Sequence, residues 1–223
     1  MAIWAIIEVF RDERLLHRIR RDLSDIGFQG IVSSEAVDKL LAIPLLQSVY
    51  SELLRLRVEV QTIFSSETED IRVNQWKIPQ GGLVVVPAGA AHRDPNVWNT
   101  GHGKYPLDQF WADRFLVYNG DKQDILTSPS DSDLKGASTG KAKFVNSGLT
   151  DTFMPYGIGE RTCPGRGFAR REIITICALF VERYDIKFVN KRQDFGMSTT
   201  FYGIGTQRPR SLIPFRIRER GDC

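Results

Sequence analysis

The chain has 223 residues, enough for one large domain or two small ones, and its 42% hydrophobic and 26% charged residues are ordinary for a globular protein. Its 30 basic and 27 acidic side chains form no basic face interleaved with aromatic residues, so we expect no nucleic-acid partner. The cysteines are odd in number and widely spaced, which indicates neither a disulfide framework nor a zinc or iron–sulfur site; they are Cys163, Cys177 and Cys223.

Residues 2–57 are predicted to be helical. Apolar residues recur at the helical period over 2–28, in two pieces, before the glycines at 27 and 30. The apolar start is interrupted by Glu8 and is too short to span a membrane, and it lacks signal-peptide features, so we expect no anchor or export signal here. A short helix over 33–43 has Ser34 as its expected N-cap, and Pro44 suits the first turn of the next helix.

Strands are predicted after residue 57. The sequence VEVQTIF, residues 58–64, is rich in β-branched residues, and residues 69–87 predict two further strands around a turn rich in proline and glycine. Residues 88–119 are irregular. The polar segment 128–143 is predicted to be a surface loop or a disordered insertion.

The last third of the chain predicts one long helix and a terminal strand. A broad apolar sector, residues 173–181, indicates that the helix over 165–184 is buried on several sides, with Cys177 in its core. Alternation in SLIPFRIRER predicts a strand at the end of the chain, and Pro214 makes it an edge or a partly paired one.

One stretch carries chemistry: FMPYGIGERTCPGRGFARREI, residues 153–173. Three glycines surround Cys163 and let the backbone approach a flat or bulky partner; they are Gly157, Gly159 and Gly165. The cysteine directly precedes a predicted helix, whose N-terminal amides favour a thiolate, and Arg161 adds a cation nearby. A lone cysteine is usually a small core residue, but this setting predicts a ligand or a nucleophile.

The two chemical roles differ in what they need. A nucleophile needs a base, whereas His17 and His102 lie far away in sequence and no local cysteine-hydrolase signature is present. A thiolate ligand to iron needs a loop that approaches a large planar cofactor and amide donors to the sulfur. The glycine pattern suits the ligand better.

The segment YGIGERTCPG, residues 156–165, resembles the haem-binding signature F-G-x-G-x-R-x-C-x-G of the cytochrome P450 monooxygenases. The resemblance implies that Cys163 is the axial thiolate of haem b (iron protoporphyrin IX), that Arg161 pairs with a haem propionate, and that the three glycines make room for the cofactor. One position departs from the pattern: Tyr156 stands where the family has phenylalanine. Its ring can still shield the sulfur, but its hydroxyl needs a partner.

Two further segments resemble the family. In ELLR, Glu52 and Arg55 are three residues apart on one helix face, where they can pair. The segment FWADRF, residues 110–115, resembles P-E-R-F, with Ala and Asp replacing Pro and Glu. The resemblance implies that Glu52, Arg55 and Arg114 form a buried charge cluster that fixes the haem-side scaffold.

His92, in HRDP at residues 92–95, keeps two interpretations. By resemblance it is a cofactor-binding residue that contacts a propionate; alternatively, it caps a turn. Substrate contacts are expected over 60–66 and 198–202.

The resemblance implies a mixed α+β, mainly helical fold: residues 1–223 form the C-terminal portion of a single cytochrome P450 domain, with small antiparallel sheets and the cysteine loop before a long buried helix. No segment resembles the family's oxygen-activating A/G-G-x-D/E-T-T motif. The implied function is haem-thiolate monooxygenation of an apolar small molecule by O2, with electrons from NADPH through a flavoprotein reductase. The alternative is a non-catalytic truncated remnant that binds haem weakly or acts only as a folding or interaction fragment.

The amino-acid sequences of the cysteine segment and of the C-terminal tail also resemble those of fungal family members that act in secondary metabolism. Family members usually associate with the endoplasmic-reticulum membrane, but we expect no anchor in these residues.

Overall fold

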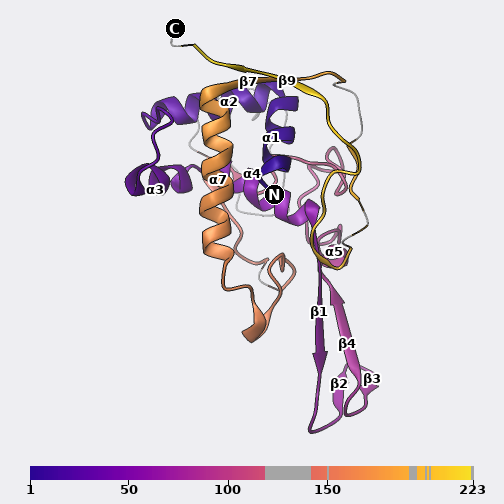
Figure 1. Cartoon of the computed structure of the whole chain (residues 1–223). Coiled ribbons are helices and arrows are strands. Elements are labelled where there is room, and N and C mark those ends of the chain that lie inside the picture. Colours follow the sequence, from indigo (N-terminus) through magenta and orange to yellow (C-terminus); the bar gives the residue numbers. More distant parts are fainter. Residues whose placement is uncertain (119–141, 150, 191–194, 199, 201, 222–223) are drawn as a thin grey trace.

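A computed structural model describes residues 1–118, 142–149, 151–190, 195–198, 200 and 202–221, without the side chain of Arg161. Five longer helices form the body of the molecule, and α7 stands at its centre with the other four packed against it (Figure 1). Their bounds are α1 Ala2–Arg11, α2 Glu13–Asp25, α3 Ser34–Ala42, α4 Pro44–Arg57 and α7 Arg166–Arg183.

Local sequence signals explain where these helices begin. Asp12 separates α1 from α2 and accepts hydrogen bonds from the amides of Arg14 and Leu15, at 2.9 and 3.1 Å. The N-cap of α3 is Ser33 and not Ser34, because the Ser33 hydroxyl accepts the Ala36 amide at 3.1 Å. Pro44 occupies the first turn of α4, as predicted.

The apolar faces of the helices meet in one core that runs between α1, α2, α3, α4 and α7. Each helix contributes residues with almost no exposed surface, among them Trp4, Ile19, Leu40, Leu53 and Ala178. Cys177 lies in this core, as expected, and burial raises the pKa of its thiol to about 12. No helix in the described part of the chain is both long and apolar enough to cross a membrane.

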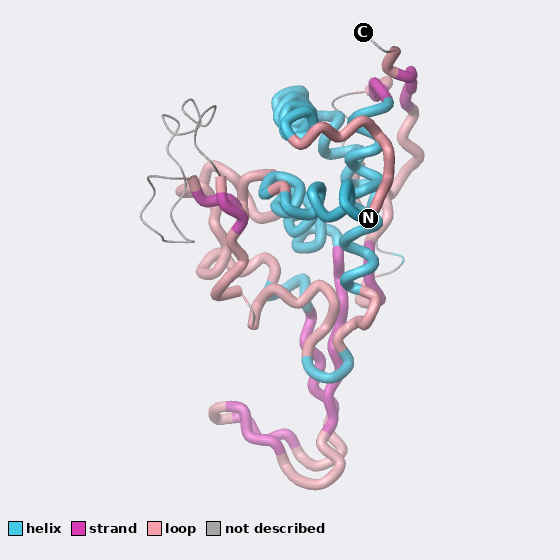
Figure 2. The backbone as a smooth tube through the Cα atoms, turned by 90° about the vertical axis from the view of Figure 1, so that its left-hand side faces the viewer, coloured by secondary structure: helices cyan, strands magenta, loops and turns pink. Residues whose placement is uncertain are grey.

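A three-stranded antiparallel sheet extends from the helical body. The strand β1 (Val58–Ser65) continues directly from α4 and lies between β4 (Leu83–Pro87) and the short β8 (Ile204–Thr206). The outer part of β1 and β4 projects as an arm that carries the hairpin of β2 (Ile71–Val73) and β3 (Trp76–Ile78) near its end (Figures 1 and 2).

Residues 69–87 therefore hold three strands, where two were predicted. The extra hairpin turns at Asn74, which has a left-handed φ of 52° that asparagine tolerates better than most residues. Two more strand pairs are short: β5 (Leu116–Val117) with β6 (Lys143–Phe144), and β7 (Tyr184–Phe188) with β9 (Phe215–Glu219). The strand β9 confirms the predicted terminal strand, whereas β7 was not predicted.

Two short helical segments complete the described elements: α5 (Ala88–Ala91) and the 3-10 turn η1 (Gly159–Arg161). Most of the loop predicted at 128–143 lies outside the described residues, and Lys143 belongs to β6. The described architecture is mixed and mainly helical with small antiparallel sheets, as predicted.

Candidate functional site

A buried charge cluster joins α4 to the segment around Arg114. Arg55 donates to both carboxylate oxygens of Glu52, at 2.8 and 2.9 Å, and Arg114 Nε donates to Glu52 Oε1 at 2.9 Å. The amide of Trp111 donates to the same oxygen at 3.2 Å. Glu52 and Arg55 are completely buried and Arg114 nearly so, so the charges are paired where water does not reach them.

The cluster also fixes the irregular chain that follows α5. Arg114 donates to the backbone carbonyls of Asn99, Pro106 and Gln109. The neighbouring Asp113, which departs from the family's glutamate, accepts from both Arg18 terminal nitrogens of α2, at 2.9 and 2.5 Å, and from the Tyr118 hydroxyl at 2.7 Å. No local sequence pattern indicates this ion pair, because Arg18 and Asp113 are 95 residues apart.

His92 is completely buried between the charge cluster and the cysteine loop. Its Nδ1 lies 3.1 Å from the Arg55 carbonyl oxygen, and its Nε2 lies 3.1 Å from the amide nitrogen of Met154. Its own carbonyl accepts from Arg55 at 2.8 Å. Both ring nitrogens have partners in the protein, so this geometry leaves neither for the propionate contact that one of the two interpretations requires. The turn-capping interpretation agrees with its backbone, because His92 is the C-cap of α5 and its amide donates to the Ala88 carbonyl at 2.8 Å. Its ring in addition joins two distant segments.

The cysteine loop is built from tight turns. Gly157 and Gly159 have φ values of 77° and 68°, in the left-handed region that favours glycine. The amide of Cys163 donates to the Tyr156 carbonyl at 3.0 Å, which closes the loop, and Gly165 then caps α7. The Cys163 side chain is exposed. The backbone of Arg161 ends η1, and its side chain lies outside the described residues, so its predicted propionate pairing stays a prediction.

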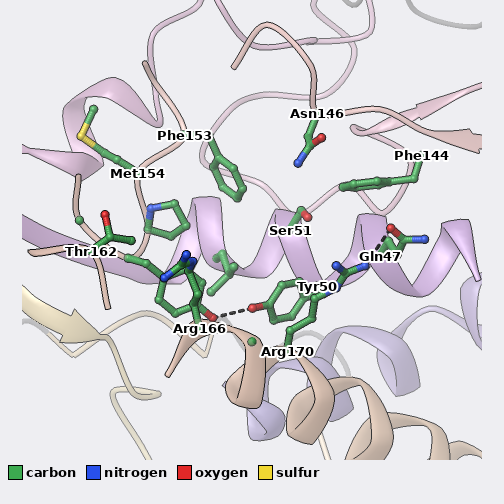
Figure 3. Close-up of a pocket in the computed structure, with 15 residues that line it drawn as sticks. Gln47, Tyr50, Ser51, Phe144, Asn146, Phe153, Met154, Thr162, Arg166 and Arg170 are labelled. Carbon is green, nitrogen blue, oxygen red and sulfur yellow. Dashed lines mark hydrogen bonds between the residues drawn. The ribbon is translucent and has the colours of Figure 1, made fainter. Parts of the chain in front are cut away.

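The hydroxyl of Tyr156 has a hydrogen-bond partner in the structure. It shares a 2.5 Å hydrogen bond with the hydroxyl of Tyr50 on α4 (Figure 3). Burial raises the pKa of both phenols, and the nearby sulfur of Cys163 adds a contribution of the same sign at Tyr156. Nothing in the spacing of these tyrosines, 106 residues apart, could have indicated the pair.

This pair lies in the wall of an open cavity of about 480 Å³. Figure 3 shows Tyr50 and Ser51 of α4 on one side, Arg166 and Arg170 of α7 on another, and Phe153 and Asn146 from the segment before the loop. Arg170 is held by the side-chain oxygen of Gln47 at 2.9 Å. Cys163 itself is not among the residues that line this cavity, although its neighbour Thr162 is.

The single thiol of Cys163 is compatible with haem, whose porphyrin brings four ligands of its own to the iron. Among the described residues, no group of three His, Cys, Asp or Glu side chains could hold a metal ion. An exposed thiol can still serve as the one protein ligand of an iron whose other ligands come from a porphyrin. The loop leaves space: a Cβ at Gly159 would meet no atom within 4 Å, and one at Gly157 would meet only Thr62 Oγ1, at 3.8 Å.

Comparison with known proteins decides the family. The family model described as cytochrome P450 matches residues 3–215. The chain belongs to the cytochrome P450 family. Relatives include the cytochrome P450 monooxygenase efuG of Hormonema carpetanum, 33% identical over 98% of this chain, and fsoE of Humicola fuscoatra, 31% identical over 98%. These matches cover only 40% and 39% of the two relatives, so the chain spans about two fifths of their length.

A solved structure shows the same cytochrome P450 fold. The retinoic acid-bound cyanobacterial CYP120A1 superposes with a TM-score of 0.69 at 19% identity, over 98% of this chain and 42% of that one. The chain therefore adopts part of a cytochrome P450 fold.

Proposed function

We propose that this chain is the haem-binding part of a haem-thiolate monooxygenase. The observation that supports it is the exposed Cys163, carried by a glycine-turned loop directly before α7 in a chain of the cytochrome P450 family. A solvent-accessible thiol at such a place is free to bind iron, whereas the only other cysteine in the described part of the chain, Cys177, is enclosed in the core.

The residues of the loop have separate roles in this proposal. Cys163 holds the iron of haem b, Gly157 and Gly159 keep Cβ atoms away from the porphyrin, and Gly165 begins α7 beside the sulfur. Arg161 neutralises a propionate. Tyr156 packs beside the sulfur and contributes the carbonyl that holds the Cys163 amide in place.

Bound haem supplies activation of molecular oxygen, with electrons from NADPH through a flavoprotein reductase and an apolar small molecule as the substrate. The protein residues described here hold the cofactor and order the loop around its ligand. Because relatives such as efuG and fsoE are fungal monooxygenases, we further propose a substrate from fungal secondary metabolism.

A second candidate is a non-catalytic remnant that binds haem weakly or acts as a folding or interaction fragment. The two functions differ in whether this chain takes up haem in a thiolate-ligated form.

The optical spectrum of the reduced chain with haem and carbon monoxide tests the proposal. We expect a thiolate-type Soret band that Cys163→Ser abolishes and that Cys177→Ala, the matched control, retains. No haem uptake by the folded chain, or an imidazole-type band, contradicts monooxygenation by this chain and favours the remnant. A thiolate-type band that survives Cys163→Ser contradicts the ligand assignment.

A further inference from the structure

The ring of His92 is the point at which the charge cluster of α4 meets the cysteine loop. On one side it contacts Arg55, the arginine that pairs with Glu52. On the other side it contacts the backbone of Met154, 62 residues further along the chain. The rings of Trp98 and Phe153 lie against it at centroid distances of 6.1 and 5.6 Å, so aromatic side chains border the buried imidazole.

The partners fix the chemical form of the ring. A backbone carbonyl can only accept, so Nδ1 carries the proton and donates to Arg55; a backbone amide can only donate, so Nε2 accepts from Met154. Only the neutral Nδ1-protonated tautomer satisfies both contacts. Burial and the positive charge of Arg55 lower the pKa of His92 to about 4, which keeps the ring neutral at neutral pH.

Two further backbone hydrogen bonds connect Met154 to the cysteine. The carbonyl of Met154 accepts the Gly157 amide at 3.1 Å, which closes the turn that contains Tyr156. The Tyr156 carbonyl in turn accepts the Cys163 amide at 3.0 Å. The chain of contacts therefore runs from the buried Glu52–Arg55 pair through the imidazole to the backbone that presents the thiol.

We propose that His92 is the positioning residue of the cysteine loop: its Nε2 holds the Met154 amide and so places the turn from which Cys163 is presented. His92 acts through the backbone and touches no cofactor. The proposal rests on the proposed function only for what Cys163 binds, since the placement of the loop is a property of the chain itself.

Two variants separate the two ring contacts. In His92→Gln the side-chain oxygen can reach the place of Nε2 and accept from Met154, whereas in His92→Asn the amide can reach only the Arg55 carbonyl. Amide hydrogen exchange of the haem-free chain is measured at Gly157 and Cys163. Because an unpaired buried amide costs a sizeable free energy, we expect exchange at both to rise roughly tenfold or more in His92→Asn and to stay near wild type in His92→Gln.

The control for a general loss of stability is Leu40→Ala, in the core of α3 and away from the loop. We expect it to lower global stability without selectively accelerating exchange at Gly157 and Cys163. Unchanged exchange in His92→Asn, or equal acceleration in the glutamine and asparagine variants, overturns the proposal. With haem added, the asparagine variant should bind more weakly than the glutamine variant and show a smaller thiolate-type Soret band.

A measurement on the wild-type chain covers the case in which the variants do not fold. Nuclear magnetic resonance of the ¹⁵N-labelled chain should detect a scalar coupling across the hydrogen bond between the Met154 amide and His92 Nε2, and its absence overturns the proposal. If wild type binds no haem but the exchange pattern holds, the proposed function fails while the positioning role stands.

Discussion

Glu52 and Cys163 occupy opposite environments, and each environment matches a different task. The Glu52 carboxylate is completely buried and accepts from two guanidinium groups and one amide, so its charge is fully paired. Removing one partner of such a cluster costs about 3–5 kcal/mol, because the remaining charges stay buried without compensation. The Cys163 thiol is exposed and available to a ligand. The buried charges therefore stabilise the scaffold, and the exposed sulfur is left for chemistry.

The hydroxyl pair of Tyr50 and Tyr156 predicts a coupled mutational effect. Tyr156→Phe leaves the Tyr50 hydroxyl without its 2.5 Å partner, and because the pair borders an open cavity, water can replace part of the bond. We expect a loss of about 1 kcal/mol in the free energy of unfolding, with less than additive loss in the double variant Tyr50→Phe/Tyr156→Phe. Denaturant titration of the wild type, Tyr50→Phe, Tyr156→Phe and the double variant measures the coupling. Additive losses would contradict a direct hydrogen bond.

The same pair sets a dependence on alkaline pH. Burial raises the pKa of both phenols in the folded chain above the unfolded value of about 10. The pair's contribution is therefore fully present below pH of about 10 and is lost as the pH rises above it. The double phenylalanine variant should lose less stability than wild type over that alkaline range.

At the scale of elements, the helices and motifs that depend on residues close together in the chain could be predicted from the sequence. The first three long helices, α4 and α7 were predicted from apolar spacing, proline and glycine, and the order of the motifs identified the family. The error at Ser33 was one residue, because both serines can cap and only the helix geometry selects between them. The strand β7 was missed because it follows α7 without a glycine or proline between them.

Contacts between distant segments could not be predicted in the same way. The bond of His92 to Met154 and the pairing of Arg18 with Asp113 depend on how α4, α2 and the loops pack in space. No local pattern in the sequence distinguishes a histidine that contacts a cofactor from one that joins two backbones. The glycine-rich loop itself was recognisable, because its unusual backbone requires particular residue types at fixed positions.

Two glycine substitutions are expected to have opposite effects on stability, because an added Cβ would meet a buried side chain at Gly89 and open space at Gly167. A Cβ at Gly89 in α5 would lie 1.7 Å from Glu59 Oε2, and Glu59 is buried and paired with Arg93 at 2.6 Å. Gly89→Ala should therefore cost about 1–3 kcal/mol. Gly167, in the first turn of α7, has no atom within 4 Å of an added Cβ, and Gly167→Ala should stabilise by up to about 1 kcal/mol.

Thermal unfolding of both variants, followed by circular dichroism, checks this contrast. Equal effects of the two substitutions would show that the close approach of α5 to β1 does not limit the residue at position 89.

At the scale of the molecule, the arm formed by β1 and β4 exposes apolar side chains. Ile63 pairs with Val85 across the two strands, and Leu83 lies two residues before Val85 on β4, so the three side chains lie on one face. They are 54%, 50% and 71% exposed in the order Ile63, Val85 and Leu83. An apolar strand face in water favours association with other apolar surfaces.

This face predicts self-association of the chain. Replacing Ile63, Leu83 and Val85 together by threonine keeps residues that suit strands but removes apolar surface from water. Because none of the three is buried, the unfolding free energy should change little, while the average mass in light scattering and the binding of a hydrophobic dye should both fall. The matched control is Ile19→Thr in the core, which should unfold the chain and raise dye binding. If the arm variant associates as strongly as wild type, the surface that mediates association lies elsewhere on the molecule.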